Sequence, residues 1–395
     1  MSTQDTKKMF EQFVLPTYTR VGPVFTRGKG SWLWDQNGVR YLDLFPGWGV
    51  SILGHCHPRI VKVVREQAAK LLHLPNNLFF KEQAMLAKEI VKSSFPSKVF
   101  FANSGAEAIE GALKFSRLFG KYQGRYEIIT MKNSFHGRTF GALSATGQAK
   151  YKAPFEPLLP MFREARFNDF EDFKKKVTAK TAGVLLELVQ GEGGVNVASQ
   201  DYIKKLREYC DKNRLLFIVD EVQTCMGRTG SLFCYSQYGI IPDIMVLSKG
   251  LGAGVPISAF AVERKISDLI KPGMHASTFG GSPLVTRAAL EVFKVIKSEK
   301  LLNNVKEKGK YLFEQLSKLK KEFKVIKEVR GKGLMLGVEL ECDAQPIFKE
   351  ALKRKVLINY THVNVLRLLP ALNVKKEEID KGIKILRDIF KTFKY

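Results

Sequence analysis

Lys249 stands where an apolar run meets a glycine-rich turn, in the segment Pro242-Asp-Ile-Met-Val-Leu-Ser-Lys249-Gly-Leu-Gly-Ala-Gly254. A solvated surface does not explain a lysine at this position, and a desolvated setting disfavours its charged form. The neutral amine that results is able to form an imine with a carbonyl group. The glycines let the backbone approach a bulky planar group closely. As a dinucleotide-binding fingerprint, the same glycines have the wrong spacing.

Asp220 is a second candidate, because it ends the apolar run Leu215-Leu-Phe-Ile-Val-Asp220 and is followed by Glu-Val-Gln223. A buried parallel strand places its last carboxylate at the carboxyl edge of the sheet, where open α/β sheets bind ligands. A helix cap or a magnesium ligand of the Walker B kind would explain the same residue. The sequence G-x-x-x-x-G-K-[ST] that accompanies a Walker B strand does not occur in the chain, which counts against a nucleotide site.

The third segment, Asn103-Ser-Gly-Ala-Glu-Ala108, is expected to follow a strand and begin a helix. Ser104 and Glu107 have the spacing of a capping box. A well-capped helix accounts for the segment by itself. The alternative is an anion site, because a glycine beside unpaired N–H groups at a helix N-terminus suits a phosphate.

Together these segments supply what pyridoxal phosphate (PLP) requires of a protein. A lysine amine forms the imine, a carboxylate keeps the pyridine nitrogen protonated so that the ring accepts electrons, and a helix N-terminus holds the phosphate. An aromatic side chain is also expected to stack on the ring. The loop Ser134-Phe-His136-Gly-Arg-Thr139 offers Phe135 or His136 for this contact.

These motifs resemble those of the class III (ornithine-type) PLP aminotransferases, which have the fold-type I architecture. Within the class, the resemblance is closest to the bacterial members that act on N-acetylornithine. It covers nearly the whole chain, from Arg27-Gly-Lys-Gly30 and Gly54-His-Cys-His-Pro58 to Arg330-Gly-Lys-Gly-Leu-Met-Leu-Gly337. Several independent motifs occur in the family's order and approximate spacing, so chance does not explain the match.

Carried over residue by residue, the resemblance implies that Lys249 is the Schiff-base lysine and that Asp220 pairs with the pyridine nitrogen. Gln223 would bond the 3-oxygen of the ring. The remaining cofactor contacts are implied to be Val222 beneath the ring, Phe135 stacked on it, and Gly105 and Ala106 at the phosphate. Thr278 resembles the threonine that reaches the phosphate of the neighbouring subunit's cofactor, which implies a homodimer with shared active sites.

The resemblance also implies the substrate contacts. Arg138 matches the arginine that grips the distal end of the substrate, and Arg367 the one that takes the α-carboxylate. A guanidinium meets a carboxylate with two parallel hydrogen bonds, which suits both roles. Glu192 matches a glutamate that can pair with the α-carboxylate arginine and mask it. Ser277 and Trp48 are assigned to the substrate pocket, where the bulky ring of Trp48 would narrow or reshape the distal part.

Two residues depart from the family pattern without touching a predicted catalytic role. Leu188 stands where the family usually has proline, and Cys225 where it usually has glycine.

The activity implied is transamination of N-acetylornithine with 2-oxoglutarate, a step of arginine biosynthesis. Succinyldiaminopimelate, ornithine and 4-aminobutyrate remain open as amino donors, and an aminomutase of the same fold remains open as a related enzyme.

The elements that must position these residues are predicted to alternate between strand and helix through the middle of the chain, which favours an α/β fold with a mainly parallel sheet. From 18 to 43 the pattern is short and alternating, as in a small antiparallel sheet, and after Pro283 amphipathic helices surround a strand pair at 325–341. We expect a large PLP-binding domain at 61–284 and a small α+β domain built from 1–60 and 285–395. The strands are expected at Val99–Ala102, Glu127–Met131, Gly183–Leu188, Leu215–Val219 and Ile244–Leu247.

The composition sets limits on other functions. A net charge of +25 over 395 residues invites a nucleic-acid-binding hypothesis. The basic residues are spread along the chain and interleaved with acidic ones, however, which is typical of a lysine-rich solvated surface. The five cysteines are scattered and form no C-x-x-C pair, so neither a disulfide framework nor a thiolate metal site is indicated. The first residues lack the apolar stretch of a signal peptide, and no apolar run is long enough to span a bilayer, so we expect a cytoplasmic location.

Overall fold

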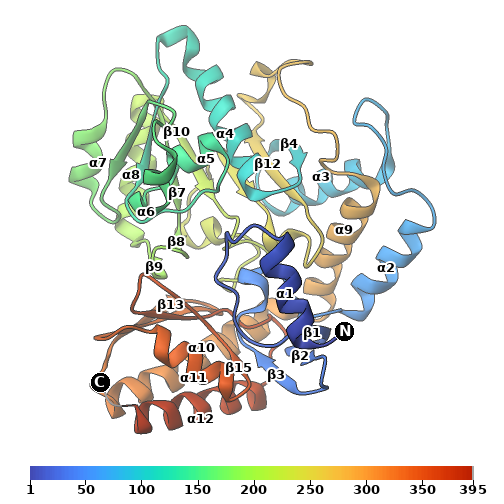
Figure 1. Cartoon of the computed structure of the whole chain (residues 1–395). Coiled ribbons are helices and arrows are strands. Elements are labelled where there is room, and N and C mark those ends of the chain that lie inside the picture. The colour runs from blue at the N-terminus through green and yellow to red at the C-terminus, as the bar shows by residue number, and fades with distance from the viewer. Residues whose placement is uncertain (394–395) are drawn as a thin grey trace.

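The computed structural model describes residues 1–393, and its largest element is a seven-stranded sheet (Figure 1). Five neighbouring strands run parallel, whereas one strand near the edge is antiparallel to both of its neighbours. In spatial order the strands are β4 (Ser97–Ala102), β12 (Ser258–Glu263), β11 (Ile244–Leu247), β10 (Leu216–Asp220), β7 (Thr181–Glu187), β5 (Glu127–Met131) and β6 (Phe162–Ala165). The runs predicted as strands form β4, β5, β7, β10 and β11, and the antiparallel β12 was not foreseen.

The central strands are buried on both faces, which is why their sequences are almost continuously apolar. Leu216 and Ile218 of β10 enter a core that contains residues of α4 (Gly105–Gly120). Phe217 and Val219 enter the opposite core together with residues of α8 (Gln200–Asn213). The sheet is therefore covered by helices on both faces, as a parallel sheet requires.

Besides the short pair of β8 (Val189–Gln190) and β9 (Asn196–Val197), residues 1–393 form two four-stranded sheets beside the large one. β1 (Phe25–Lys29), β2 (Trp32–Asp35) and β3 (Arg40–Asp43) form an antiparallel series that β15 (Val356–Leu357) joins in parallel with β3. The other sheet has the order β13 (Ile326–Lys332), β14 (Met335–Leu340), β17 (Val365–Leu368) and β16 (Asn359–Thr361). Because β15 pairs with β3, segments from both ends of the chain build one sheet, as the sequence predicted. The limits at 60 and 284 stay a prediction.

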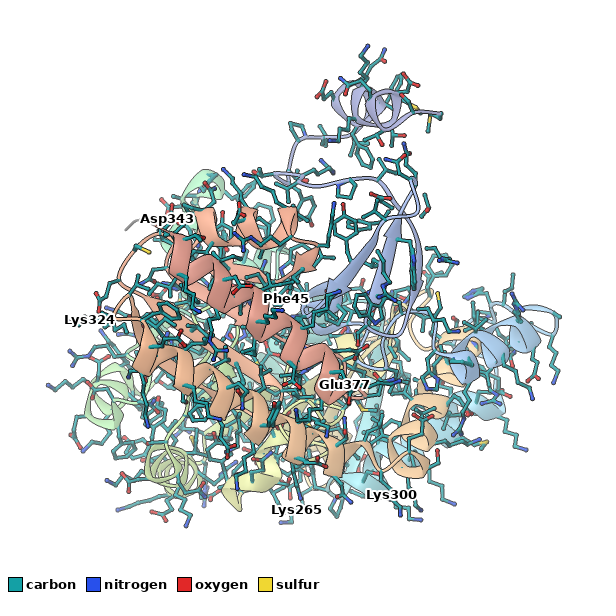
Figure 2. All side chains as sticks on the ribbon, turned by 90° about the horizontal axis from the view of Figure 1, so that it is seen from below. Phe45, Lys265, Lys300, Lys324, Asp343 and Glu377 are labelled. Atoms are coloured by element: carbon teal, nitrogen blue, oxygen red, sulfur yellow. The ribbon has the colours of Figure 1, made fainter. Side chains whose placement is uncertain are left out.

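The helices α10 (Leu301–Glu322), α11 (Gln345–Lys353) and α12 (Lys376–Thr392) belong to this smaller part, and Figure 2 shows them from below. The same figure shows α1 (Thr3–Phe13) standing off the body, and none of its residues is buried. The other helices are α2 (Pro58–Ala68), α3 (Lys81–Ser93), α5 (Phe140–Ala145), α6 (Ala149–Lys152), α7 (Phe170–Lys176) and α9 (Pro283–Ser298).

A search of the helices formed by residues 1–393 finds none with the length and apolar character needed to traverse a bilayer. The cytoplasmic location stays a prediction.

Candidate active site

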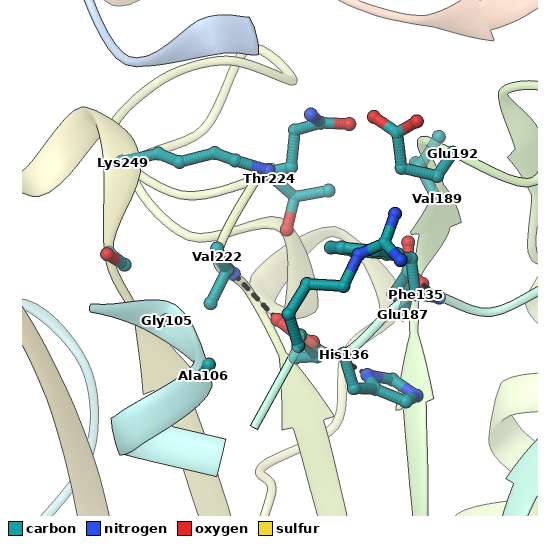
Figure 3. Close-up of a pocket in the computed structure, with 15 residues that line it drawn as sticks. Gly105, Ala106, Phe135, His136, Glu187, Val189, Glu192, Val222, Thr224 and Lys249 are labelled. Atoms are coloured by element: carbon teal, nitrogen blue, oxygen red, sulfur yellow. Dashed lines mark hydrogen bonds and ion pairs between the residues drawn. The ribbon is translucent and has the colours of Figure 1, made fainter. Parts of the chain in front are cut away.

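A cavity of about 260 Å³ opens at the carboxyl ends of β7, β10 and β11. This is the edge at which open α/β sheets bind ligands. Figure 3 shows Lys249 reaching into the cavity, with Gly105 and Ala106 below it and with Glu187 and Glu192 on the far side. Nine residues predicted as cofactor or substrate contacts line it: Gly105, Ala106, Phe135, Arg138, Glu192, Asp220, Val222, Gln223 and Lys249.

Asp220 is the last residue of β10 and is 4% exposed at the floor of the cavity. One carboxylate oxygen, Oδ1, accepts a hydrogen bond of 3.0 Å from the N–H of Val222. The other, Oδ2, lies 2.8 Å from Nδ1 of His136. His136, which the sequence offered as a stacking residue, instead fixes the orientation of the carboxylate. A carboxylate held in this way is suited to pair with a protonated ring nitrogen above it.

Lys249 follows β11 and has a positive φ of 41°. Burial lowers the pKa of its amine, although the negative charges of Glu192, Asp220 and Glu187 act in the opposite direction. A lowered pKa raises the share of neutral amine, the form that attacks a carbonyl. The structure therefore provides the desolvated lysine that the sequence predicted.

The start of α4 forms another wall of the cavity. Ser104 is the N-cap and accepts the N–H of Glu107 at 3.3 Å. The carboxylate of Glu107 reaches back to the N–H of Asn103, one residue before the cap, so the predicted capping box forms only in part. At Gly105 a Cβ atom would lie 3.0 Å from a methyl group of Val222. Close packing thus favours glycine here and leaves the first N–H groups of the helix facing the cavity, as a phosphate site requires.

One polar atom of the Gln223 side chain has no hydrogen-bond partner among residues 1–393. Its Nε2 donates a hydrogen bond of 3.1 Å to the carbonyl of Trp48. Its Oε1 is buried and finds no hydrogen-bond partner among residues 1–393. Buried acceptors without a partner are rare in proteins, so this oxygen is available to a bound group that carries a donor.

Arg367, which is buried, forms an ion pair with the partly buried Glu192 above the floor. Nη1 of Arg367 lies 2.7 Å from Oε1 of Glu192, and the arginine is 1% exposed. The same nitrogen donates to the carbonyl of Gly191 at 3.0 Å, while Oδ1 of Asn359 accepts from the other two nitrogens. Burial would raise the pKa of Glu192, but the charge and the hydrogen bond of Arg367 bring that pKa below its usual value. The pairing implied by the family resemblance is present in this structure.

Arg138 lies at the rim of the cavity and is exposed. Its guanidinium packs over the ring of Tyr151, 3.9 Å from the ring centre, and more distantly over Phe135 at 5.5 Å. No carboxylate of residues 1–393 is paired with it. Arg138 is thus available to an anionic group entering from solvent.

Ser277 and Thr278 do not line the cavity. Oγ of Ser277 accepts the N–H of Gly280 at 3.0 Å, close to Asn103, and Thr278 is exposed. Trp48 is 48% exposed and lines a neighbouring hollow of about 930 Å³, which also contains Arg367 and shares Glu192 with the cavity. A single chain therefore assembles the cofactor side of the predicted site but leaves Thr278 and Ser277 outside it.

Two site residues were missed by sequence reasoning. Glu187 lines the cavity at the end of β7 and is 6% exposed. It carries the signal that identified Asp220, namely a carboxylate closing a buried apolar strand. Asn359 faces Arg367 across the hairpin of β16 and β17 and holds it through its amide oxygen, but it does not close an apolar run and so gave no such signal.

The family model described as aminotransferase class-III matches residues 16–390. This chain belongs to that family. As a class III aminotransferase it uses PLP, as the sequence predicted. The partly buried lysine with its lowered pKa, the oriented Asp220 and the unpartnered Gln223 oxygen fit this group.

This class III aminotransferase is 48% identical to the acetylornithine aminotransferase of Caldanaerobacter subterraneus subsp. tengcongensis, with 98% of this chain and 99% of that protein covered. It is 45% identical to the acetylornithine aminotransferase of Methanocaldococcus jannaschii over the whole of both chains. Among solved structures, the ornithine aminotransferase of Toxoplasma gondii superposes with a TM-score of 0.95 at 32% identity, covering 99% and 95% of the two chains. The acetylornithine aminotransferase of Elizabethkingia anophelis does so with a TM-score of 0.89 at 29% identity, covering both chains fully.

Proposed function

We propose that this enzyme transfers the terminal amino group of N-acetylornithine to 2-oxoglutarate, giving N-acetylglutamate semialdehyde and glutamate. The observation that carries the proposal is the ion pair of the buried Arg367 with Glu192 at 2.7 Å, above an oriented aspartate and a desolvated lysine. Full-length similarity to acetylornithine aminotransferases supports this choice of donor.

The floor of the site holds the cofactor in this proposal. PLP, when bound, supplies a ring that accepts electrons from the carbon bearing the reacting amino group. Asp220 keeps the ring nitrogen protonated, Gln223 donates to or accepts from the ring's 3-oxygen substituent, and Phe135 and Val222 pack on the ring faces. Gly105 and Ala106 supply N–H groups to the phosphate. Lys249 Nζ removes a proton from the substrate carbon as a general base and returns a proton as a general acid.

Arg367 and Glu192 let one pocket serve two substrates. When the donor presents its amine end, Glu192 neutralises Arg367, so no free guanidinium repels that amine. When 2-oxoglutarate enters, its α-carboxylate displaces Glu192 and takes the arginine with two charged hydrogen bonds. Arg138 binds the carboxylate at the distal end of either substrate from the rim, and Trp48 bounds the space that an acyl group would fill.

We further propose that the enzyme works as a homodimer. Thr278 is exposed and lies outside the cavity of its own chain, which suits a residue that completes a partner's phosphate site. In this arrangement each site draws Thr278 from the other subunit.

The first test is the visible absorbance of the purified protein before and after N-acetylornithine is added without a keto acid. We expect a band of enzyme-bound PLP that gives way to the pyridoxamine phosphate form. A band that persists would rule out this donor, and initial rates with succinyldiaminopimelate, ornithine and 4-aminobutyrate would then identify the donor. Protein that shows no band after PLP is supplied would contradict the assignment of the site residues.

A further inference from the structure

Glu187 is a second carboxylate beside Asp220 on the floor of the site. The two residues end neighbouring parallel strands and face each other in register. Both line the cavity, and both are almost completely buried. Asp220 has an assigned partner in the proposed function, whereas the proposed reaction gives Glu187 no task. A buried carboxylate is costly unless its oxygens are satisfied, so its contacts indicate what it is for.

Each oxygen of Glu187 accepts one backbone N–H, and the two N–H groups come from different loops. Oε1 accepts from Phe135 at 2.7 Å, and Oε2 accepts from Gly191 at 3.0 Å. The first loop carries the ring-stacking Phe135 and the rim residue Arg138. The second loop carries Glu192. One side chain therefore ties a loop that contacts the cofactor to a loop that controls the substrate carboxylate.

The connection continues from Gly191 to Arg367. The peptide unit between Gly191 and Glu192 offers its carbonyl to Nη1 of Arg367 at 3.0 Å. A Cβ atom at Gly191 would lie 1.6 Å from Oε1 of Gln223, so this backbone packs directly against the predicted partner of the ring's 3-oxygen. A displacement of Gly191 would therefore alter the contacts of both Arg367 and Gln223.

The charge of Glu187 is sensitive to conditions near neutral pH. Its pKa is raised to about 7, mainly by burial and also by the neighbouring charge of Asp220, while His136 and the two backbone N–H groups oppose this rise. An ionised carboxylate accepts both N–H groups well, whereas protonation weakens one of these two bonds because it occupies one oxygen with a proton.

We propose that Glu187 is a positioning residue, whose carboxylate couples the Phe135 loop to the Gly191–Glu192 loop and so holds the Arg367 pair in register with the cofactor. This inference rests on the proposed function of the site. It predicts that Glu187 influences the binding of both substrates through Arg367, and that its influence is lost when it is protonated.

The experiment compares wild type with Glu187→Gln, which keeps the shape but cannot accept both N–H groups. We expect KM for the amino donor and for 2-oxoglutarate to rise together, by about ten- to hundredfold, with a smaller change in kcat. The fall of kcat/KM as the pH drops through about 7 should disappear in the variant. Glu192→Gln serves as the matched control, because it removes a carboxylate one residue from Gly191 and should retain that fall. Unchanged KM values and an unchanged pH profile in Glu187→Gln would overturn the proposal.

A second readout needs no variant. In the wild-type holoenzyme, hydrogen exchange of the peptides containing Phe135 and Gly191 should quicken together as the pH falls below about 7, after correction for the intrinsic rate. Independent behaviour of the two peptides would overturn the coupling even if Glu187→Gln failed to fold. The absorbance band of bound PLP distinguishes failure of the role proposed for Glu187 from failure of the proposed function. If the band is present and the coupling absent, only the role of Glu187 is lost, whereas a missing band in wild type contradicts the proposed function.

Discussion

On the floor of the site, Asp220 and Glu187 are buried at the ends of adjacent strands and are fixed by hydrogen bonds to neighbouring loops. At its mouth, Trp48 and Arg138 stand exposed on loops and pack against aromatic rings. On the floor, each oxygen of these two carboxylates is engaged in a hydrogen bond, which fixes the orientation of both side chains. The mouth keeps exposed groups that only a substrate or a second subunit would engage.

This difference assigns different tasks to the two regions. A cofactor that remains bound through many turnovers needs a site of fixed geometry, since small displacements of reacting groups reduce rates strongly. Two substrates that differ in charge need a region that can exchange partners, and the pair formed by Arg367 and Glu192 lies at the boundary between the two. Substitutions of Lys249 and Asp220 should therefore affect the chemical step, and substitutions at the mouth should affect the choice of substrate. Glu187, which links the floor to the Arg367 pair, is the exception and should act mainly on substrate binding.

The largest effect is expected for Lys249→Ala. Loss of the amine removes both the attachment of the cofactor and the general base, so kcat should fall by at least about 10⁴-fold, the upper range for general acid–base catalysis. Single-turnover assays with added PLP would measure the loss. Lys271→Ala, at an exposed lysine, is the control and should retain full activity. A Lys249→Ala enzyme with substantial turnover would refute the assignment of the floor.

Arg367→Lys tests the boundary between floor and mouth. Lysine keeps the charge but loses the planar fork that the α-carboxylate and Asn359 engage. We expect kcat/KM for 2-oxoglutarate to fall by about ten- to hundredfold, the value of one or two charged hydrogen bonds. The band of bound PLP should stay unchanged, because Arg367 is no part of the floor. Equal losses of cofactor and of 2-oxoglutarate binding would show that the two regions are not separable.

The floor was largely predictable from sequence, and the mouth less so. Lys249 and Asp220 each stand at the end of an apolar run. Recognising the strand in the sequence therefore also locates the functional residue at its carboxyl end. The helix start at Gly105 has a comparable local signal in its cap. Arg367 and Glu192 come from segments that meet only in the folded chain, and both were assigned through family resemblance. Asn359 was missed although it lies only eight residues before Arg367, and the run that forms β12 was not predicted as a strand, so neither the strand nor its antiparallel direction was foreseen.

The stability of the protein is also expected to depend on pH, because a further buried carboxylate, that of Glu221, lies beneath the floor. Burial raises the pKa of Glu221 to about 7, while hydrogen bonds from Thr224 and Tyr235 oppose this. The folded state therefore keeps a proton that the unfolded chain releases above its ordinary pKa of 4.5. The contribution of this proton to the free energy of unfolding is complete below pH 4.5. It falls by about 1.4 kcal/mol per pH unit as the pH rises from 4.5 to about 7, where it is lost. The Tm should accordingly be higher at about pH 6 than at about pH 8.

Glu221→Gln isolates this contribution. The amide keeps an acceptor for the N–H of Tyr235 and offers its NH₂ to the hydroxyl of Thr224, and it does not titrate. The difference between the two Tm values should shrink by a few degrees in the variant. A difference as large as that of wild type would mean that Glu221 is ionised throughout and that the floor tolerates its charge.

The smallest effect is expected for Trp48→Phe at the mouth. Gln223 donates to the backbone carbonyl of Trp48, so the contact with the floor does not depend on the indole. The side chain is about half exposed, and its replacement should leave the Tm within about one degree of wild type.

The smaller ring enlarges the space for the distal end of the donor, so the ratio of kcat/KM for succinyldiaminopimelate to that for N-acetylornithine should rise about threefold to tenfold. If instead the ratio stays constant and kcat falls, Trp48 acts through the positive-φ turn that it shares with Gly47, and this part of the mouth belongs with the rigid floor.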